Sequence, residues 1–142
     1  MYVDKFKYMD DQPISMSLDS SPENVSEIQP YVDRIVQKYQ VKSDMYGNIL
    51  ISLTEAITNA IVHGNQADQS KKVHVNSLFE KDSIRVKIQD EGEGFDYEEV
   101  PDPTDPMNIL TLNGRGVFLM HQLSDGVEYS DNGSTVEIKF KL

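Results

Sequence analysis

The hydrophobic positions between residues 43 and 65 repeat with the period of an amphipathic helix. The side chains expected to face the core are Ile49, Leu50, Leu53, Ala56, Ile57, Ala60 and Ile61. At about 100° per residue, Glu55, Asn59 and His63 fall together in a polar stripe about 80° wide on the opposite side. We therefore predict one helix that is capped by Ser43 and ends at Gly64-Asn65, residues suited to a left-handed C-terminal turn.

The polar stripe of this helix has two interpretations: it is either a solvated face or the wall of a pocket. Solvated helix faces are usually filled with Lys, Glu, Gln and Arg, whereas Thr58, Asn59 and His63 are mediocre helix formers. This choice of residues favours the pocket, and the solvated face stays open as the alternative.

Two further elements are predicted before this helix. Residues 13–19 alternate between apolar and polar side chains, as in a half-buried strand. A helix follows, with Ser20 or Ser21 as its cap and Pro22 in its first turn. Its apolar stripe consists of Val25, Ile28, Val32, Ile35, Val36 and Tyr39. Pro30 interrupts the stripe and should kink or restart the helix.

The second half of the chain is predicted to contain four strands and one helix. The expected strands are residues 73–79, 84–88, 127–130 and 134–142. Short turns at Lys81-Asp82 and Asp131-Asn132-Gly133 join them into two hairpins. Between the hairpins, residues 90–114 form a loop rich in glycine, proline and acids, and a helix is expected from about Val117 to Leu123.

The order of these elements, β-α-α-β-β-loop-α-β-β, predicts the fold class. We expect an α/β (α+β) fold, a two-layer α/β sandwich in which helices cover one face of a mixed, mostly antiparallel sheet. The 142 residues contain no internal repeat or linker, so residues 1–142 are expected to form a single domain. A chain of this length buries about two thirds of its unfolded surface in one core.

Composition narrows the classes of partner. The chain has 13 Lys and Arg against 24 Asp and Glu, and its net charge of −11 argues against nucleic acid or anionic lipid as the main partner. The absence of cysteine excludes disulfides, thiolate metal sites and a Cys nucleophile. No apolar run approaches the roughly 18 residues that a bilayer requires, so a cytoplasmic location is expected.

A carboxylate followed by two glycines stands after the strand 84–88. In Asp90-Glu-Gly92-Glu-Gly94-Phe95-Asp96, the glycines let the backbone approach a flat ligand while Asp90 accepts a hydrogen bond. An exocyclic amine is a good donor for that bond. An acidic turn whose glycines supply positive φ is the alternative.

A second glycine motif, Asn113-Gly114-Arg115-Gly116-Val117, leads into the next helix. Backbone N–H groups at a helix N-terminus suit a phosphate, and Arg115 adds bidentate contact. A glycine-rich helix start without a ligand is the alternative for this motif alone. Because three ligand-suited segments occur in order, their combination favours a binding site.

Several other sites are excluded by the sequence. There is neither a GxxxxGK[ST] nor a GxGxxG motif that opens a helix after a strand, which rules out a P-loop and a Rossmann site. His63, His74 and His121 are scattered and form no HExxH motif, so a zinc site is not expected. Nothing in the chain resembles a nucleophile elbow.

Together the motifs resemble those of a known superfamily. The Glu55/Asn59 helix with its HGN ending, DEGEGFD and NGRGVFLM resemble the N, G1 and G2 boxes of the Bergerat-fold (GHKL) ATPases. The compact length, the HGN ending and GRGVFLM are most similar to the bacterial anti-sigma-factor serine/threonine protein kinases. The resemblance covers residues 14–142 and implies a domain that binds ATP with Mg²⁺.

The resemblance also implies roles for individual residues. Asn59 is similar to the amide that coordinates Mg²⁺, and Glu55 to the catalytic base that takes the proton of a substrate serine. Asp90 matches the carboxylate that reads the adenine amine. The other nucleotide-binding positions implied are His63, Gly92, Gly94, Phe95, Gly114, Arg115, Gly116, Val117 and Thr135. Among these, Thr135 would support the Asp90 contact, and His63 has no settled role.

Two functional hypotheses follow from the resemblance. In the first, the protein phosphorylates an anti-anti-sigma (antagonist) protein, otherwise sequesters a sigma factor, and forms a homodimer. In the second, it is a nucleotide-gated module that holds a partner without phosphate transfer. Glu55 distinguishes them, since a pure binder needs Asn59 and Asp90 but no base. Direct contact with nucleic acid or membrane is not expected.

Overall fold

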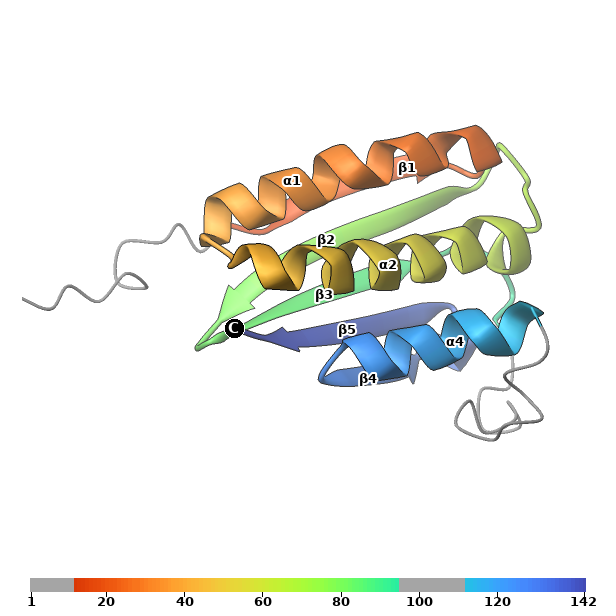
Figure 1. Cartoon of the computed structure of the whole chain (residues 1–142). Helices are drawn as coiled ribbons and strands as arrows, with labels where there is room; N and C mark the ends of the chain where they lie inside the picture. The colour runs from red at the N-terminus through yellow and green to blue at the C-terminus, as the bar shows by residue number, and fades with distance from the viewer. Residues whose placement is uncertain (1–11, 95–111) are drawn as a thin grey trace, which may run out of the picture.

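The protein is built on a five-stranded antiparallel sheet with helices on one of its faces (Figure 1). The computed structural model describes residues 12–94 and 112–142, with only the backbone of residues 112–115. The strands are β1 (Ile14–Asp19), β2 (Lys72–Glu80), β3 (Ser83–Gln89), β4 (Gly126–Ser130) and β5 (Thr135–Lys141). Their order is β1-β2-β3-β5-β4, and all four pairings between them are antiparallel. The predicted two-layer fold is therefore confirmed, with antiparallel pairing throughout the described strands instead of a mixed sheet.

Three helices form the second layer. They are α1 (Ile28–Tyr39), α2 (Ser43–Asn59) and α4 (Leu112–Leu123). Helix α2 lies between α1 and α4 above the sheet (Figure 1). Shorter helical turns are η2 (Pro22–Glu27), the π-turn η3 (Ala60–Gly64) and η4 (Asp131–Gly133). Among the described residues, no helix has both the length and the apolar character needed to cross a membrane.

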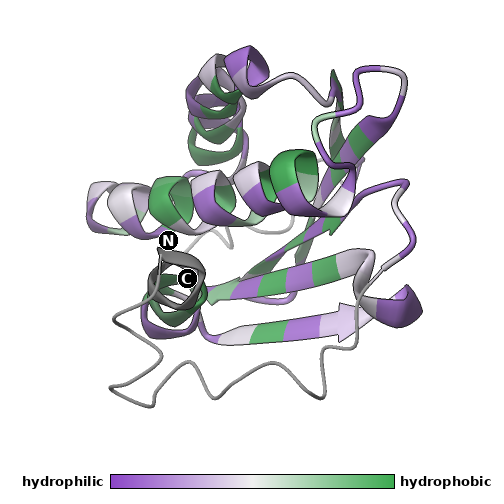
Figure 2. Ribbon diagram, turned by 90° about the vertical axis from the view of Figure 1, so that its right-hand side faces the viewer, coloured by the Kyte–Doolittle hydropathy of each residue, from purple (hydrophilic) through white to green (hydrophobic). Residues whose placement is uncertain are grey.

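The core lies between the helices and the inner face of the sheet. In β3, Ile84, Val86 and Ile88 are buried while Arg85 and Lys87 between them are exposed. The ribbon coloured by hydropathy shows this alternation along the strands (Figure 2). The matching helix side chains include Val32, Ile35, Ile49, Leu53 and Ile57, none of which is measurably exposed. Alternation in the strands and helical periodicity in α1 and α2 thus correctly predicted that these side chains face the core.

The starts of the first two helices differ from the prediction. The segment restarts as the Pro30 interruption suggests: η2 covers Pro22–Glu27, and α1 begins at Ile28 with Pro30 in its first turn. Of the predicted serine caps, only Ser21 stands at an N-cap position. Ser21 is the N-cap of η2 without a side-chain cap bond, and the Ser20 hydroxyl donates to the Lys71 carbonyl at 2.7 Å. Lys42 occupies the N-cap position of α2, so Ser43 is already inside the helix.

The end of the long central helix also differs. The helix continues past Asn59 as the π-turn η3, and Asn65 keeps a right-handed conformation with φ −92° and ψ 0°. Left-handed backbone appears one residue later, at Gln66 and Ala67. The predicted left-handed turn at Gly64-Asn65 is therefore wrong, and the requirement for glycine at position 64 has another cause.

Helix α4 begins at Leu112, about five residues before the predicted start at Val117. Glycine is a poor helix former by about 1 kcal/mol relative to alanine, which is why the glycines at 114 and 116 suggested a later start. Packing against α2 outweighs this preference, since Gly116 lies directly against Glu55 of α2 and Met120 is buried. The terminal hairpin is confirmed, with left-handed φ angles at Asp131, Asn132 and Gly133 in its turn.

Candidate functional site

A cavity of about 290 Å³ opens between helices α2 and α4 and the ends of strands β3, β4 and β5. It is lined by Ala56, Asn59, Ala60, His63, Gly64, Ile88, Asp90, Gly94, Val117, Met120, Tyr129, Gly133, Ser134 and Val136. Most of these side chains are apolar or small, and a few polar groups converge among them. This composition is typical of sites that bind small organic molecules.

Three of the polar residues come from the segments that the sequence singled out. Asn59 ends α2, His63 lies one turn later in the π-turn, and Asp90 follows the end of β3. The structure brings all three to one cavity, although residues 59 and 90 are far apart in the sequence. This placement supports the pocket interpretation of the polar stripe for Asn59 and His63.

Among the described residues that line this cavity, Asp90 carries the only acidic side chain. Burial raises the pKa of its carboxyl group, while the backbone N–H of Gly92, which donates to Oδ1 at 2.9 Å, lowers it. The backbone N–H of Asp90 donates to the Ser134 carbonyl at 2.9 Å and ties the residue to the chain just before β5. A carboxylate that is half-buried and held by its own backbone can accept a hydrogen bond from a ligand.

Close backbone approaches explain the glycines around Asp90. A Cβ atom on Gly64 would overlap the Asp90 carboxylate, and a Cβ atom on Gly92 would overlap the Gly64 carbonyl oxygen. Gly94 has φ +83°, and a Cβ atom there would overlap the Asn132 carbonyl. The three glycines therefore let the helix end, the strand end and the hairpin turn meet at the cavity.

Glu55 lies beside the cavity and not on its wall. It is half-buried one helical turn before Asn59, and its carboxylate lies against Gly116 of α4, where a Cβ atom would overlap Oε2. Glycine at position 116 thus makes room for an acidic group at the contact between α2 and α4. Val117, the next residue of α4, lines the cavity.

The structure describes only some of the remaining predicted site residues. Gly114 and Arg115 are in the first turn of α4. The Arg115 side chain lies outside the described structure, as does all of Phe95. The buried hydroxyl of Thr135 donates to Asp131 Oδ2 at 3.0 Å. This bond ties the start of β5 to the hairpin turn, and support of Asp90 by Thr135 stays a prediction.

The structure adds Met120, Tyr129 and Ser134 to the site, which the sequence did not predict. Tyr129 comes from β4, and burial raises the pKa of its hydroxyl group. Its position in the apolar-polar alternation of Val127, Glu128 and Tyr129 was the available signal, since alternate residues of an end strand face the helices. Nothing in the sequence indicated that this inner face borders a cavity.

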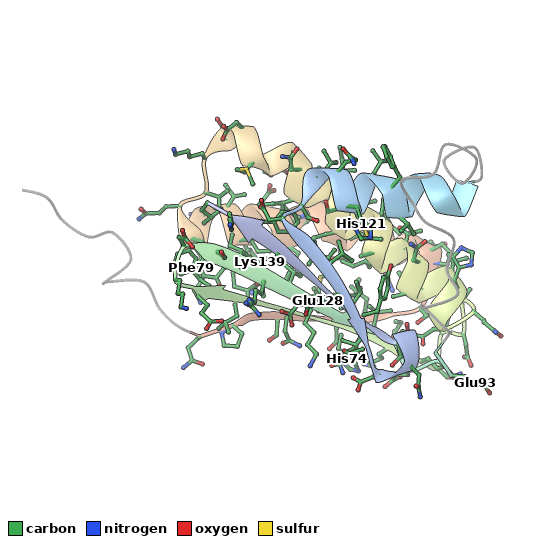
Figure 3. All side chains as sticks on the ribbon, turned by 90° about the horizontal axis from the view of Figure 1, so that it is seen from below. His74, Phe79, Glu93, His121, Glu128 and Lys139 are labelled. Atoms are coloured by element: carbon green, nitrogen blue, oxygen red, sulfur yellow. The ribbon has the colours of Figure 1, made fainter. Side chains whose placement is uncertain are left out.

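The histidines do not gather in one place. His74 lies on the outer face of β2 and His121 on α4, on opposite sides of the sheet (Figure 3). In the described part of the chain, no group of three or more His, Cys, Asp and Glu side chains is arranged to hold a metal ion.

Comparisons with known proteins agree with this geometry. The family model described as "Histidine kinase-like ATPase domain" matches residues 18–140. The serine-protein kinase RsbW of Staphylococcus epidermidis is 32% identical over 134 residues, covering 88% of this chain and 84% of that protein. The serine-protein kinase RsbW of Listeria monocytogenes is 27% identical over 130 residues, covering 87% and 83%.

A solved structure has the same fold. The crystal structure of the RsbU and RsbW domains of Rv1364c from Mycobacterium tuberculosis superposes with a TM-score of 0.63 at 13% identity. The match covers 90% of this chain and 31% of that larger one, and at this identity it bears on the fold alone. Family model, relatives and fold agree, and the chain belongs to the histidine kinase-like ATPase family and, within it, to the serine-protein kinases of the RsbW type.

Proposed function

We propose that this chain, a serine-protein kinase of the RsbW type, binds ATP with Mg²⁺ in the cavity and phosphorylates a serine of an anti-anti-sigma protein. In its other state it would hold a sigma factor. We further propose a cytoplasmic location and a homodimer. The observation that carries the proposal is the convergence of Asp90, Asn59 and Glu55 at one cavity and its α2–α4 border.

Asp90 is proposed to read the adenine base. Its carboxylate accepts a hydrogen bond from the exocyclic amine, while Ile88, Met120 and Val136 supply apolar contact for the ring. Gly64 and Gly94 leave the space that a flat ring needs. The chemistry of these residues fits an adenine, because the Asp90 acceptor stands beside apolar side chains that can contact the ring.

Asn59 is proposed to be the protein ligand of Mg²⁺. An amide oxygen suits a hard cation, and Mg²⁺ usually takes few protein ligands because it keeps waters and binds phosphate oxygens. Asn59 lies on the cavity wall within one turn of Glu55. The cation would neutralise charge on the phosphates of the nucleotide, and Gly114, Arg115 and Gly116 at the start of α4 would face the phosphate side.

Glu55 is proposed to be the catalytic base. Its carboxylate would accept the proton of the substrate serine hydroxyl as the serine oxygen forms a bond to the γ-phosphorus. The bond between that phosphorus and its bridging oxygen breaks, and ADP leaves. Because Gly116 has no side chain, the Glu55 carboxylate can lie at the α2–α4 border beside the proposed metal site. His63, Gly92, Phe95, Val117 and Thr135 complete the proposed nucleotide-binding set.

The second candidate function is a nucleotide-gated binding module without phosphate transfer. It requires Asn59 and Asp90 but gives no role to Glu55. The space that Gly116 leaves for the Glu55 carboxylate favours the kinase, since a module without a base has no need for an acid at that place.

Affinity capture tests the proposed function. The tagged protein is used to capture partners from native cell extract with and without ATP, and a captured candidate is then incubated with labelled ATP. We expect label on a serine of one captured protein, and a sigma factor among the others. Capture of partners without any label transfer would support the module instead.

Replacing Asp90 with Asn should weaken binding of ADP by about 10- to 150-fold, the range expected when a hydrogen bond to a charged acceptor is lost. The affinity for Mg²⁺-pyrophosphate should not change, because only base reading is removed. Isothermal titration with both ligands measures the difference. An equal loss for both would contradict the assignment of Asp90.

The same variant should not lose stability. Burial raises the pKa of the Asp90 carboxyl group in the folded protein, so folding favours the protonated form. The stability that this carboxyl group contributes is therefore present below its unfolded pKa and lost as pH rises through its folded pKa. Asparagine carries no charge at any pH. We therefore expect the unliganded Asp90→Asn protein to unfold at the same temperature as wild type or higher at pH 7, as measured by thermal unfolding.

A further inference from the structure

We infer that Asn65 is a positioning residue for adenine binding, because its buried amide holds the backbone N–H of Glu91, the residue that directly follows Asp90. The inference rests on the proposed function and assigns a role that the site residues alone do not include. Asn65 is 1% exposed and does not line the cavity, so it would act through the chain that carries Asp90.

The side chain of Asn65 forms three hydrogen bonds to three different segments. Its Oδ1 accepts from the backbone N–H of Glu91 at 2.8 Å. Its Nδ2 group donates to the Ser20 hydroxyl at 2.8 Å and to the Lys72 carbonyl at 3.0 Å. One buried amide thus joins the chain after β1, the start of β2 and the chain after β3.

The bond to Glu91 is the one that bears on Asp90. Glu91 directly follows Asp90, and Gly64, which directly precedes Asn65, lies against the Asp90 carboxylate. Gly92 in turn lies against the Gly64 carbonyl. The two short segments, 64–65 and 90–92, are therefore in contact along their length, and the Asn65–Glu91 bond sets how one lies on the other.

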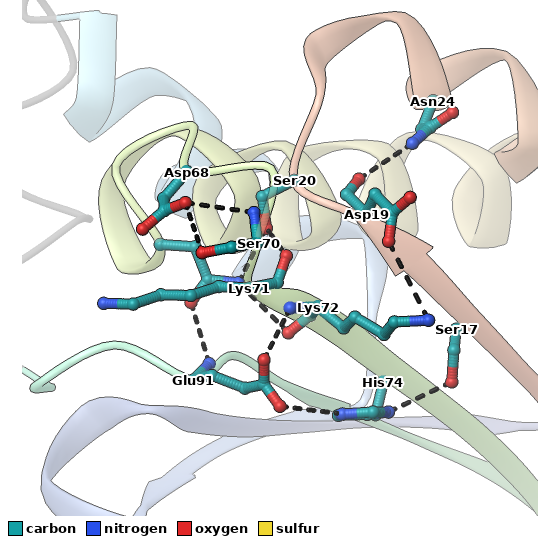
Figure 4. A network of polar contacts seen from close by, with 11 residues as sticks. Ser17, Asp19, Ser20, Asn24, Asp68, Ser70, Lys71, Lys72, His74 and Glu91 are labelled. Carbon is teal, nitrogen blue, oxygen red and sulfur yellow. Dashed lines mark hydrogen bonds and ion pairs between the residues drawn. The ribbon is translucent and has the colours of Figure 1, made fainter.

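The Glu91 side chain strengthens the same attachment from the outer side of the sheet. Its Oε1 accepts from the Lys72 backbone N–H at 2.6 Å, and Oε2 lies 3.4 Å from His74 Nε2 (Figure 4). The Lys72 backbone bond holds the pKa of the Glu91 carboxyl below its usual value, with a smaller contribution from His74. The backbone of residue 91 is thus held by its own amide and by its side chain.

Titration of three variants with ADP and with Mg²⁺-pyrophosphate tests the inference. Asn65→Ala removes the acceptor of the Glu91 N–H, and we expect about tenfold weaker ADP binding with pyrophosphate affinity unchanged. Ser20→Ala is the matched control, since it removes a buried partner of Asn65 but leaves the Asn65–Glu91 bond, so ADP affinity should not change. Asn65→Asp keeps the acceptor and should restore ADP affinity even where stability is lower.

Equal weakening of ADP and pyrophosphate by Asn65→Ala would overturn the inference, as would an identical effect of Ser20→Ala. Hydrogen exchange in the wild type gives a test that does not depend on variants folding. The Glu91 amide should exchange slowly, and more slowly with ADP bound; exchange at the rate of a free peptide would also overturn it. If the wild type binds no ADP, the proposed function fails instead.

Discussion

Replacing Glu55 with Gln should lower the rate of phosphate transfer by about 10²- to 10⁴-fold, the usual contribution of a general base. ATP affinity should stay unchanged, because Glu55 does not line the cavity and the amide keeps its size beside Gly116. Glutamine cannot take the serine proton, so the loss should appear in kcat with little change in the KM for ATP. Single-turnover transfer from labelled ATP measures it.

Glu128→Gln is the control for this experiment. Glu128 is exposed on the outer face of the sheet (Figure 3), and the same change of charge there should leave transfer at the wild-type rate. Undiminished transfer by Glu55→Gln would show that another group takes the proton. Loss of ATP binding by this variant would instead assign Glu55 to the nucleotide site itself.

The second large effect concerns Gly92, which lies against the Gly64 carbonyl. Gly92→Ala should destabilise the protein by about 1–3 kcal/mol, the range for forcing a methyl group into a filled space. The added Cβ would overlap the Gly64 carbonyl, and a backbone atom cannot move aside as a flexible side chain can. Separation of these two segments should also weaken ADP binding. Urea unfolding and titration with ADP measure the two effects.

Gly47→Ala is the matched control, since the same substitution there should stabilise the protein. Gly47 is exposed within α2, and an added Cβ meets no described atom within 4 Å. Alanine there should stabilise the protein by about 0.5–1 kcal/mol, because it restricts the unfolded chain and favours the helix. A Gly92→Ala protein as stable as wild type would show that the contact between residues 92 and 64 relaxes without cost.

The periodic elements of the fold could be predicted from the sequence, because hydrophobic alternation is a local signal. Both hairpins and the central helices were found in this way. The place of β5 beside β3 was not predictable, since that pairing joins strands separated by α4 and β4. The predicted cap at Ser20 failed for a similar reason: Ser20 bonds to Lys71, 51 residues away, instead of to the adjacent helix.

In the candidate site, too, local motifs could be predicted and contacts between distant residues could not. Asn59 and Asp90 were found because their neighbours form short motifs. Asn65 was taken for a turn residue, and its role became visible only through partners at positions 20, 72 and 91. Glycine at position 64 was correctly singled out for the wrong reason, since a close approach to Asp90 and not a left-handed turn requires it.

The π-turn at the end of α2 makes the position of Asn65 sensitive to chain length. The backbone N–H of Asn65 donates to the Ala60 carbonyl, five residues earlier, at 2.8 Å. In an α-helix the acceptor would be the carbonyl four residues earlier. The turn therefore contains one residue more than regular winding would use. Loss of one residue between 60 and 64 would therefore change where the Asn65 side chain lies relative to α2. Homologues that lack this residue should therefore need another group to fasten the chain after β3.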